Sequence, residues 1–502
     1  MNTSPTFDIG KPVLQPIWVD PVSGDDTNSG DARAQALKTL PEAWRRVPDQ
    51  PDGRGRHIRL CPGTYTTNVE NQILLQDKHG SHAWPIVIGP ADLPLSVELP
   101  QVSVRRSSSV YMVDLAFAAA SNPYTIPSED LVLHFAGCRD ILVRGVTAKG
   151  IEINSTRPAI TYKANQCHRV YVEDCDFSYG AYNALDYVSV QWGHIVRSRF
   201  HDCNAEGMYV KGGSAYLLIA NNEVFNSKNI GIQAGQGTGF QYMIPPWLHY
   251  EAYDIKIVNN VIYNAGGGLG VQGGYNILAA WNTCYRVGSS RDTIVVGLGG
   301  RGWNGPRPKI VDDFFKLGGW CNPSSGEGYN IPNRNVLICN NVICNPDGYE
   351  SRHAHIGLSG PVATLPDSNL PNPARADDGL EIRGNVIWNG GADKPVLDDV
   401  ENMYHLAARP TADAAELCRL NAINTLRPEF IDPEQGDFRP VPGGKLSGFA
   451  PVALKDFEWS DAPARPEVPP GNLDNQVVAD RMGKSREKGN CVGAHVAENA
   501  AR

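Results

Sequence analysis

The sequence predicts an all-β protein folded as a right-handed parallel β-helix, a solenoid of short strands with long loop insertions. Three observations lead to this prediction. A segment of alternating apolar residues that ends in asparagine recurs along the chain, and successive repeats lie a little over twenty residues apart, which suits one coil of three short strands. A third observation is the composition of the 502 residues, in which 51 glycines and 37 prolines allow many turns.

The repeats place an asparagine at one recurring position. The clearest copies are residues 217–224, 255–262 and 336–343, and variants occur at 277–284 and 380–387. Alternation of apolar residues turns one face of each strand into the solenoid and the other towards solvent. We therefore expect the recurring side chains to stack at one bend as a structural ladder of amides. These side chains are Asn222, Asn260, Asn282, Asn341 and Asn385.

The spacing of this marker position locates the insertions. Earlier coils keep the apolar pattern without asparagine, and the marker advances from 175 to 198, from 198 to 222 and from 260 to 282. The steps from 222 to 260, 282 to 341 and 341 to 385 are too long for one coil. They predict insertions near 236–253, 288–333 and 345–378, and long loops on a rigid scaffold often carry function.

The predicted organisation has three parts. Residues 1–60 form an N-terminal opening segment and cap, 61–440 the β-helix with its insertions, and 441–502 a C-terminal extension that packs on the helix. The eleven cysteines include no CxxC pair. For Cys167, Cys175 and Cys203, burial as small apolar side chains between coils is favoured over disulfide bonding.

Charge and hydropathy exclude some partners. A net charge of −9 and a pI near 5.8 argue against a nucleic-acid binder, although a cleft can still be locally basic. No stretch is apolar enough to predict a membrane span, and residues 1–17 lack the features of a signal peptide. If the protein is exported, its signal is absent from this sequence.

Both ends resemble a known family. The opening segments resemble secreted parallel β-helix polysaccharide lyases of the pectate lyase-like superfamily, and they comprise residues 18–21, 24–30, 38–40 and 62–65. The closing segments of the same proteins are similar to residues 428–433, 436–439 and 492–494. The resemblance implies a monomeric β-helix that acts on a polysaccharide or oligosaccharide in a secreted or periplasmic location. Related ends also occur on glycoside hydrolases and on proteins of unknown activity, so the reaction needs its own argument.

Lyase chemistry on a uronic acid polymer requires neutralisation of the carboxylate, a base for the C5 proton and a proton donor for the leaving oxygen. In residues 205–213, if Met208 and Val210 point inwards, Tyr209 and Lys211 share the outer face about 7 Å apart. Residues 211–225 also resemble the lysine-containing coil of alginate lyases and chondroitinase B-type enzymes. Lys211 is the predicted base and Tyr209 the predicted acid, and a solvated surface lysine is the alternative.

Neighbouring coils supply candidates for substrate binding. Gln233 aligns with Tyr209 and Gln272 with Lys211, and Gln236 follows in the same coil. Amides on a floor of glycines would leave room for a sugar chain and could bond its hydroxyl or carboxylate groups. The alternative is that they are ordinary exposed amides.

The first two insertions add aromatic and basic side chains. Trp247 could stack on sugars, and His249 with Tyr250 could supply an acid and a base in a metal-free lyase. The alternative is that this loop packs its own aromatics on the scaffold. Arginines that could hold a carboxylate, and a further aromatic candidate, are Arg286, Arg291, Arg301 and Trp303.

Calcium is left open as a cofactor. Asp186, Asp202 and Glu206 are its candidate ligands because Ca²⁺ prefers hard oxygen donors, although the sequence has no compact aspartate-rich loop. The three glycines at 266–268 lie between predicted strands of the solenoid, so they indicate a bend and no nucleotide site.

The function predicted from the sequence is a polysaccharide lyase that cleaves a uronic-acid-containing glycan by β-elimination. A glycoside hydrolase is the nearest alternative and would pair Glu206 with Asp186 or Asp202. A glycan-binding solenoid without activity, like a phage tailspike, is the third.

Overall fold

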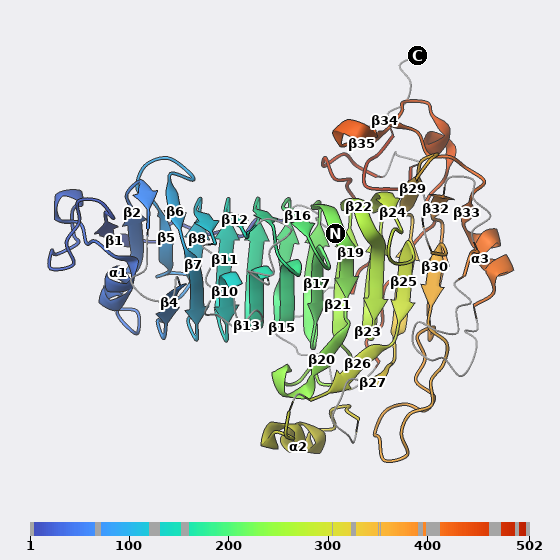
Figure 1. The fold of residues 1–502 in the computed structure, drawn as a ribbon, viewed down its shortest axis with the longest axis horizontal. Coiled ribbons are helices and arrows are strands. Elements are labelled where there is room, and N and C mark those ends of the chain that lie inside the picture. Colours follow the sequence, from blue (N-terminus) through green and yellow to red (C-terminus); the bar gives the residue numbers. More distant parts are fainter. Residues whose placement is uncertain are drawn as a thin grey trace. The chain divides into compact units, whose positions relative to one another are not determined.

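The computed structural model describes residues 5–65, 72–119, 131–151, 160–303, 305–322, 328–349, 351, 353–389, 395–397, 412–460, 473–486 and 491–497. The described chain forms two compact units. We call Pro5–Asp186 with Gly193–Asn204 the N-terminal unit, and Tyr187–Trp192 with the residues from Ala205 onwards the C-terminal unit. Each is built from parallel strands, as Figure 1 shows.

The N-terminal unit repeats short strands that pair with the equivalent strands of the neighbouring coil. Its strands are β1 (Leu14–Val19), β2 (Gly55–Leu60), β3 (Gly63–Thr64), β4 (Gln72–Gln76), β5 (Ile86–Pro90), β6 (Val97–Leu99), β7 (Gln101–Arg105), β8 (Val110–Val113), β9 (Ala116–Ala118), β10 (Leu131–Ala136), β11 (Arg139–Arg144), β12 (Thr147–Lys149), β13 (Ile160–Glu173), β14 (Asp176–Ser178) and β16 (Arg199–Cys203). One column of parallel pairs runs β1, β2, β5, β8, β11 and β13. Helix α1 (Leu40–Arg46) is capped by Thr39, whose hydroxyl accepts the N–H of Glu42. The helix buries Leu40 and Trp44.

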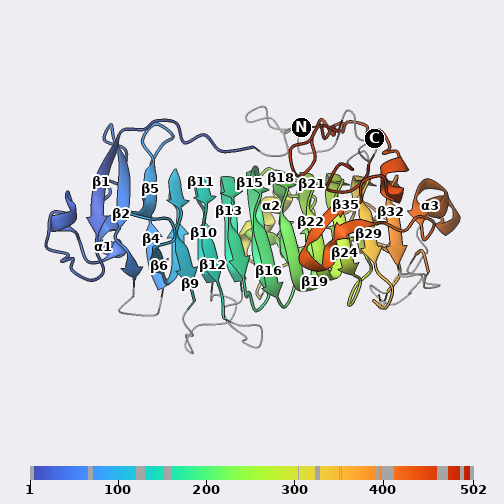
Figure 2. The ribbon, with the colours of Figure 1, turned by 90° about the horizontal axis from the view of Figure 1, so that it is seen from above.

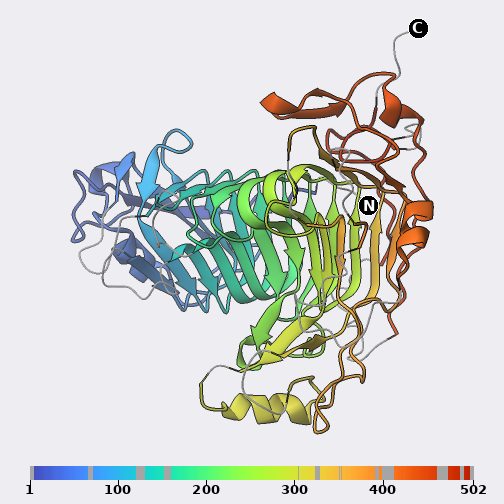
Figure 3. The ribbon, with the colours of Figure 1, turned by 45° about the vertical axis from the view of Figure 1, so that its right-hand side comes forward.

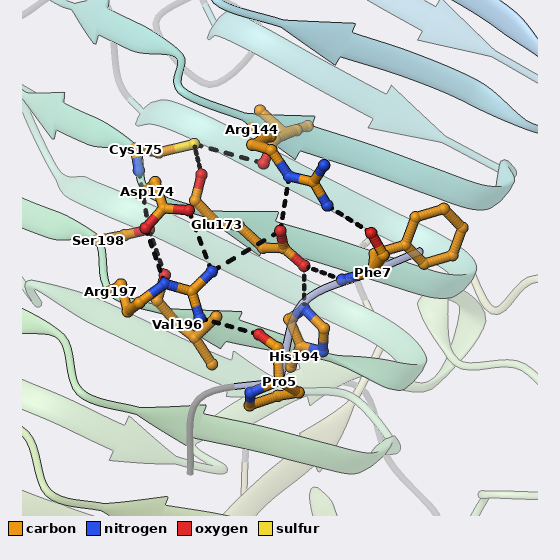
Figure 4. A network of polar contacts seen from close by, with 11 residues as sticks. Pro5, Phe7, Arg144, Glu173, Asp174, Cys175, His194, Val196, Arg197 and Ser198 are labelled. Atoms are coloured by element: carbon orange, nitrogen blue, oxygen red, sulfur yellow. Dashed lines mark hydrogen bonds and ion pairs between the residues drawn. The ribbon is translucent and has the colours of Figure 1, made fainter. Parts of the chain in front are cut away.

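The N-terminal segment is fastened to this unit by one buried carboxylate, that of Glu173. Figure 2 shows the segment running back over β5 and β11, and Figure 4 shows its attachment. The Phe7 N–H (2.6 Å), His194 Nε2 (2.7 Å) and Arg144 Nε (2.7 Å) all contact the Glu173 carboxylate. Burial raises the pKa of Glu173, but these hydrogen bonds outweigh it and hold the pKa at about 2.

The C-terminal unit continues the pattern with longer strands. Its strands are β17 (Met208–Lys211), β18 (Ser214–Ala220), β19 (Glu223–Ala234), β21 (Ala252–Val258), β22 (Val261–Gln272), β23 (Gly274–Ala280), β24 (Thr283–Val287), β25 (Ile294–Gly297), β28 (Arg334–Cys339), β29 (Val342–Asn345), β30 (Ile356–Leu358), β31 (Glu381–Arg383), β32 (Val386–Asn389) and β33 (Ala422–Ile423), and β15 (Asn183–Val196) contributes residues to both units. Figure 3 shows these strands stacked as successive coils.

The predicted asparagine ladder is confirmed. Asn282 Oδ1 accepts the backbone N–H of Asn260 (2.9 Å), and Asn282 Nδ2 donates to Asn341 Oδ1 (3.0 Å). The same contacts join Asn222 to Asn260 and Asn341 to Asn385, and Asn421 extends the ladder by one coil. The residue before each ladder asparagine adopts positive φ in most coils, as at Asn221 (59°), Asn259 (59°) and Asn340 (58°). This explains the Asn-Asn pairs, since asparagine tolerates that conformation.

The extents of two predicted insertions are wrong. Residues 288–333 contain β25 and residues 345–378 contain β30, and both pair in parallel with neighbouring strands of the solenoid. Part of each long step is therefore regular solenoid, and the inserted segments are shorter than predicted. The insertions proper contribute β20 (Gly237–Gly239), β26 (Gly299–Gly302) and β27 (Gly328–Ile331), a separate three-stranded sheet, and α2 (Lys309–Lys316). We call this sheet the insertion sheet, and Figure 1 shows it with α2 below β21 and β23.

The end regions also differ from the predicted boundaries. Stacking begins with β1 rather than at residue 61, and β33 is its last strand. Helix α3 (Ala414–Leu420) precedes β33, and β34 (Phe430–Asp432) and β35 (Asp437–Pro440) form an antiparallel pair outside the solenoid. The extension after residue 440 packs on the C-terminal unit, where Asn475 Oδ1 lies 2.6 Å from Lys256 Nζ.

Burial of the cysteines is confirmed. All eleven are free thiols, and every one except Cys418 is buried. In the part of the chain that the structure describes, no helix is both long and apolar enough to cross a membrane.

Candidate functional site

The strand β17 presents Tyr209 and Lys211 on one face, as the alternation of its residues predicts. Met208 and Val210 have no exposed surface, Tyr209 is 8% exposed, and Lys211 is half-buried. Lys211 Nζ lies 4.5 Å from the centre of the Tyr209 ring. Two glycines then end the strand at positive φ, Gly212 at 66° and Gly213 at 78°. A Cβ on Gly213 would lie 2.3 Å from the carbonyl oxygen of Trp247, so the tight turn after Lys211 requires glycine.

A chain of polar contacts extends from Lys211 across the neighbouring coils. Lys211 Nζ donates to Gln236 Oε1 (3.0 Å), and Gln236 Nε2 donates to Glu206 Oε1 (3.1 Å). The same Glu206 oxygen accepts Asn229 Nδ2 (2.9 Å), and Arg291 Nε donates to Asn229 Oδ1 (2.9 Å). We call Glu206, Tyr209, Lys211, Asn229, Gln236 and Arg291 the lysine cluster.

Asn229 is the member that sequence reasoning missed. It lies where the pairing of β19 with β22 shifts register between Ser227 and Ile230, and such a bulge redirects a side chain. The pair Lys228-Asn229 breaks the alternation before Ile230, but the bulge becomes visible only when the neighbouring strand is placed beside it.

The predicted glutamine patch exists, but it is buried. Tyr209 pairs with Gln233, and Gln233 Nε2 donates to Gln272 Oε1 (2.7 Å) and to the Gly235 carbonyl (2.9 Å). Only 2% of Gln233 and 4% of Gln272 is exposed. The prediction that these amides line an open surface, as sugar ligands or as ordinary exposed groups, is therefore wrong, because both side chains are buried and hydrogen-bonded to each other.

The aromatic residues of the first insertion form a core cluster. Trp247 has no exposed surface and packs with Tyr216, Tyr253 and Trp459. The prediction that Trp247 stacks on a sugar is therefore wrong. The expected role of Tyr250 as a catalytic group is not supported either, since it is 3% exposed and its ring packs against Tyr275.

His249 is half-buried within the same cluster, and its ring meets the Trp320 ring edge-on at 4.8 Å. The hydroxyl of Tyr253 accepts the backbone N–H groups of both His249 (2.8 Å) and Tyr250 (2.7 Å). The loop is thus held by its own aromatics. This was the alternative left open for it, and an acid–base pair of His249 and Tyr250 finds no support.

Arg301 has a structural role instead of the predicted carboxylate-binding one. It is fully buried and forms an ion pair with Glu251, which is also fully buried, at 2.5 Å. Glu251 further accepts the N–H of Gly212 (3.1 Å) and the hydroxyl of Thr238 (2.6 Å). The pair therefore ties the insertion sheet to the turn that follows Lys211.

Two further candidates are occupied by other partners. Trp303 is buried with Phe240 and Val311 beside α2, and Arg307 lies over its ring at 4.7 Å. Arg286 Nη2 contacts Glu434 Oε1 at 2.7 Å. Of the predicted arginines, only Arg291 joins the lysine cluster.

The predicted calcium ligands do not fit a calcium site. Lys163 lies 3.2 Å from the buried Asp186 carboxylate, His201 Nδ1 lies 2.6 Å from Asp202, and Glu206 accepts two amides. Among the described residues, no three His, Cys, Asp or Glu side chains form a group that could hold a metal ion.

The comparisons with known proteins concern the fold. Residues 134–290 match a family model described as a right handed beta helix region. The structure of pectate lyase Pel9A is 13% identical over 90% of this chain and 95% of that chain, with a TM-score of 0.42. The structure of XylC with xylose is 9% identical over 96% and 99%, with a TM-score of 0.45. The A-module of the Azotobacter vinelandii mannuronan C-5 epimerase is 12% identical over 68% and 89%, with a TM-score of 0.39.

A comparison with curated proteins gives no match to this sequence. The family match and the parallel pairing of successive coils together confirm the predicted fold. The chain is a right-handed parallel β-helix.

Proposed function

We propose that the protein is a polysaccharide lyase that cleaves a uronic-acid-containing glycan by β-elimination at the lysine cluster. The observation that carries the proposal is the joint presentation of Lys211 and Tyr209, with the amine 4.5 Å from the phenol ring. β-Elimination needs a base that removes the C5 proton and a proton donor that reaches the leaving oxygen at C4. An adjacent lysine and tyrosine can supply both.

Four members of the lysine cluster divide the tasks of this reaction. Lys211 removes the proton from C5, and Tyr209 protonates the oxygen at C4 as the glycosidic bond breaks. Arg291, the half-buried guanidinium of the cluster, binds the substrate carboxylate and makes the C5 proton more acidic. Gln236 orients the lysine amine through their 3.0 Å hydrogen bond.

Glu206 is a positioning residue in this proposal. It is 5% exposed, and its Oε1 accepts from both Gln236 and Asn229. A buried carboxylate that holds two amides fixes their orientation towards Lys211 and Arg291. A substrate of this kind is a polymer met outside the cytoplasm, so we also propose that the protein acts in a secreted or periplasmic location.

The test is an absorbance screen. Incubation with polygalacturonate, alginate and chondroitin should raise the ultraviolet absorbance on at least one polymer, because β-elimination creates a conjugated double bond. Lys211→Ala should lower the rate at least about 100-fold. The matched control is Lys228→Ala, an exposed lysine on the next coil, which should leave the rate unchanged.

The other outcomes assign the protein to a different class. New reducing ends without absorbance would indicate a glycoside hydrolase, and bound polymer without either product would indicate a glycan-binding solenoid. A rate that falls on addition of a chelator would show that a metal takes part and would contradict neutralisation of the substrate carboxylate by Arg291 alone. A Lys211→Ala variant with full activity would exclude the lysine as base.

A further inference from the structure

A polar groove lies in the N-terminal unit and shares no residue with the lysine cluster. Its volume is 690 Å³, and its walls come from the turns at residues 79–82, 106–109 and 137–140, with Arg169 from the next coil. The segments between β4 and β5 and between β7 and β8, together with Gly137 and the first two residues of β11, Arg139 and Asp140, carry most of its side chains. The groove is a product of coil stacking, since each coil contributes one turn.

The groove is basic although the whole chain is acidic. It contains Arg106, Arg139 and Arg169, and the only carboxylate among its lining residues is Asp140. Arg169 forms a two-pronged ion pair with Asp140 at 2.5 and 2.8 Å. Arg106 does the same with Asp77 at 2.8 Å. These pairs hold two guanidinium groups in place between neighbouring coils.

Arg139 is the unneutralised charge of the groove. It is exposed, and its guanidinium has no hydrogen bond or ion pair with any described residue. The pKa of the adjacent His168 lies below its ordinary value because burial disfavours the charged ring, and Arg139 and Arg169 repel its positive charge. The positive charge of Arg139 is thus open to an anionic ligand in the groove.

The floor of the groove is made of small residues whose own polar groups are satisfied. The hydroxyl of Ser107 donates to the Arg105 carbonyl (2.9 Å), and that of Ser108 donates to the Gly80 carbonyl (3.1 Å). Gly137 leaves further space beside Arg106, whose Cγ would lie 3.8 Å from a Cβ at that position. The Arg139 guanidinium therefore supplies donors for a ligand, and its geometry matches planar or tetrahedral oxyanions.

We infer that this groove is a second glycan-binding site, which holds a carboxylate or sulfate group of an acidic polysaccharide on Arg139 between the two anchored arginines. The inference rests on the proposed function for the choice of a glycan, and on the groove alone for the choice of an anion. Such a site retains a charged polymer independently of its cleavage.

The experiment measures binding by calorimetry on the full chain carrying Lys211→Ala and Arg291→Ala, so that no substrate is consumed and the lysine cluster no longer binds the carboxylate of a probe. The probes are a galacturonate hexamer, a chondroitin sulfate hexamer and the neutral maltohexaose. Arg139→Glu should weaken binding of at least one anionic probe ten-fold or more, and maltohexaose should not bind. The control is Arg419→Glu, an exposed arginine in α3, which should leave Kd unchanged. Comparison of the two anionic probes tells whether carboxylate or sulfate is preferred.

The groove and the proposed lyase can fail separately. Three results would overturn the proposal that the groove binds an acidic glycan. They are equal binding of an anionic probe to the Arg139→Glu and Arg419→Glu variants, binding of maltohexaose with the same Kd as an anionic probe, and no binding of either anionic probe. Binding that depends on Arg139, in a protein that cleaves no polymer, would support glycan binding by the groove and exclude the proposed lyase activity. In an active enzyme, Arg139→Glu should raise KM without changing kcat.

Discussion

At the scale of single residues, buried polar groups with several partners carry much of the specificity of this fold. Asn282 is the clearest example, because its amide serves three coils. It accepts from Asn260 and donates to Asn341 and to the Ile257 carbonyl. A repeat that stacks by main-chain pairing alone can slip, whereas a ladder of amides fixes the register of each coil.

Asn282→Leu should therefore lower the free energy of unfolding by about 2–3 kcal/mol, because it leaves buried donors and acceptors of Asn260 and Asn341 without partners. Denaturant titration followed by circular dichroism measures this. The control is Asn264→Gly, at an exposed asparagine with φ of 51°, which should change stability by less than about 0.5 kcal/mol. Equal losses in the two variants would contradict the role of the ladder.

Glu173 makes stability depend on pH. Its pKa of about 2 lies below the ordinary value of 4.5, so the stabilisation is fully present above about pH 4.5 and is lost as the pH falls towards 2. The loss should amount to about 3 kcal/mol. Denaturant titrations between pH 5 and 2 measure the free energy of unfolding, which should decline less steeply with falling pH for Glu173→Gln than for the wild type. Parallel curves would mean that other carboxylates account for the acid sensitivity.

At the scale of elements, the insertion sheet depends on one buried ion pair. Arg301 donates to Glu251 and to the carbonyls of Leu248, His249 and Trp320. Because Glu251 also binds the Gly212 N–H, the pair connects the inserted strands to the end of β17, which carries Lys211.

Arg301→Leu should lower the free energy of unfolding by about 3–5 kcal/mol, since it leaves the Glu251 carboxylate buried without its counter-charge. Any activity that depends on Lys211 should fall with it. Arg419→Leu removes an exposed i,i+3 pair and should cost less than about 0.5 kcal/mol. If Arg301→Leu retained full stability, Glu251 would have to be neutral or solvated, contrary to its burial.

At the scale of the whole molecule, the cysteines act as small apolar side chains between coils and form no cross-links. Burial raises the pKa of Cys175, Cys284, Cys339 and Cys344 to about 12, which suppresses the reactive thiolate. Stacking of neighbouring coils, rather than covalent bonds, holds the solenoid together.

Thiol titration should therefore count about one reactive group in the native protein, Cys418, and eleven after denaturation. The melting temperature should be the same with and without a reducing agent. A lower count after denaturation, restored by reduction, would reveal disulfides and contradict the structure.

The sequence by itself determined the parallel β-helix, the asparagine ladder and the shared face of Tyr209 and Lys211. These follow from local rules, because strand alternation has a fixed period of two and equivalent positions in successive coils must stack. It also aligned Gln233 with Tyr209 correctly, since the register between adjacent coils follows from the repeat.

Only the tertiary structure decided how far each candidate is buried and with what it pairs. Trp247 and Arg301 look like binding residues in the sequence, yet loop packing over the coils buries both. Asn229 joins the lysine cluster because a bulge redirects it, and Arg139 lies between two arginines because three coils bring their turns together. Burial and pairing across an insertion depend on contacts between residues far apart in the chain, and no local pattern records them.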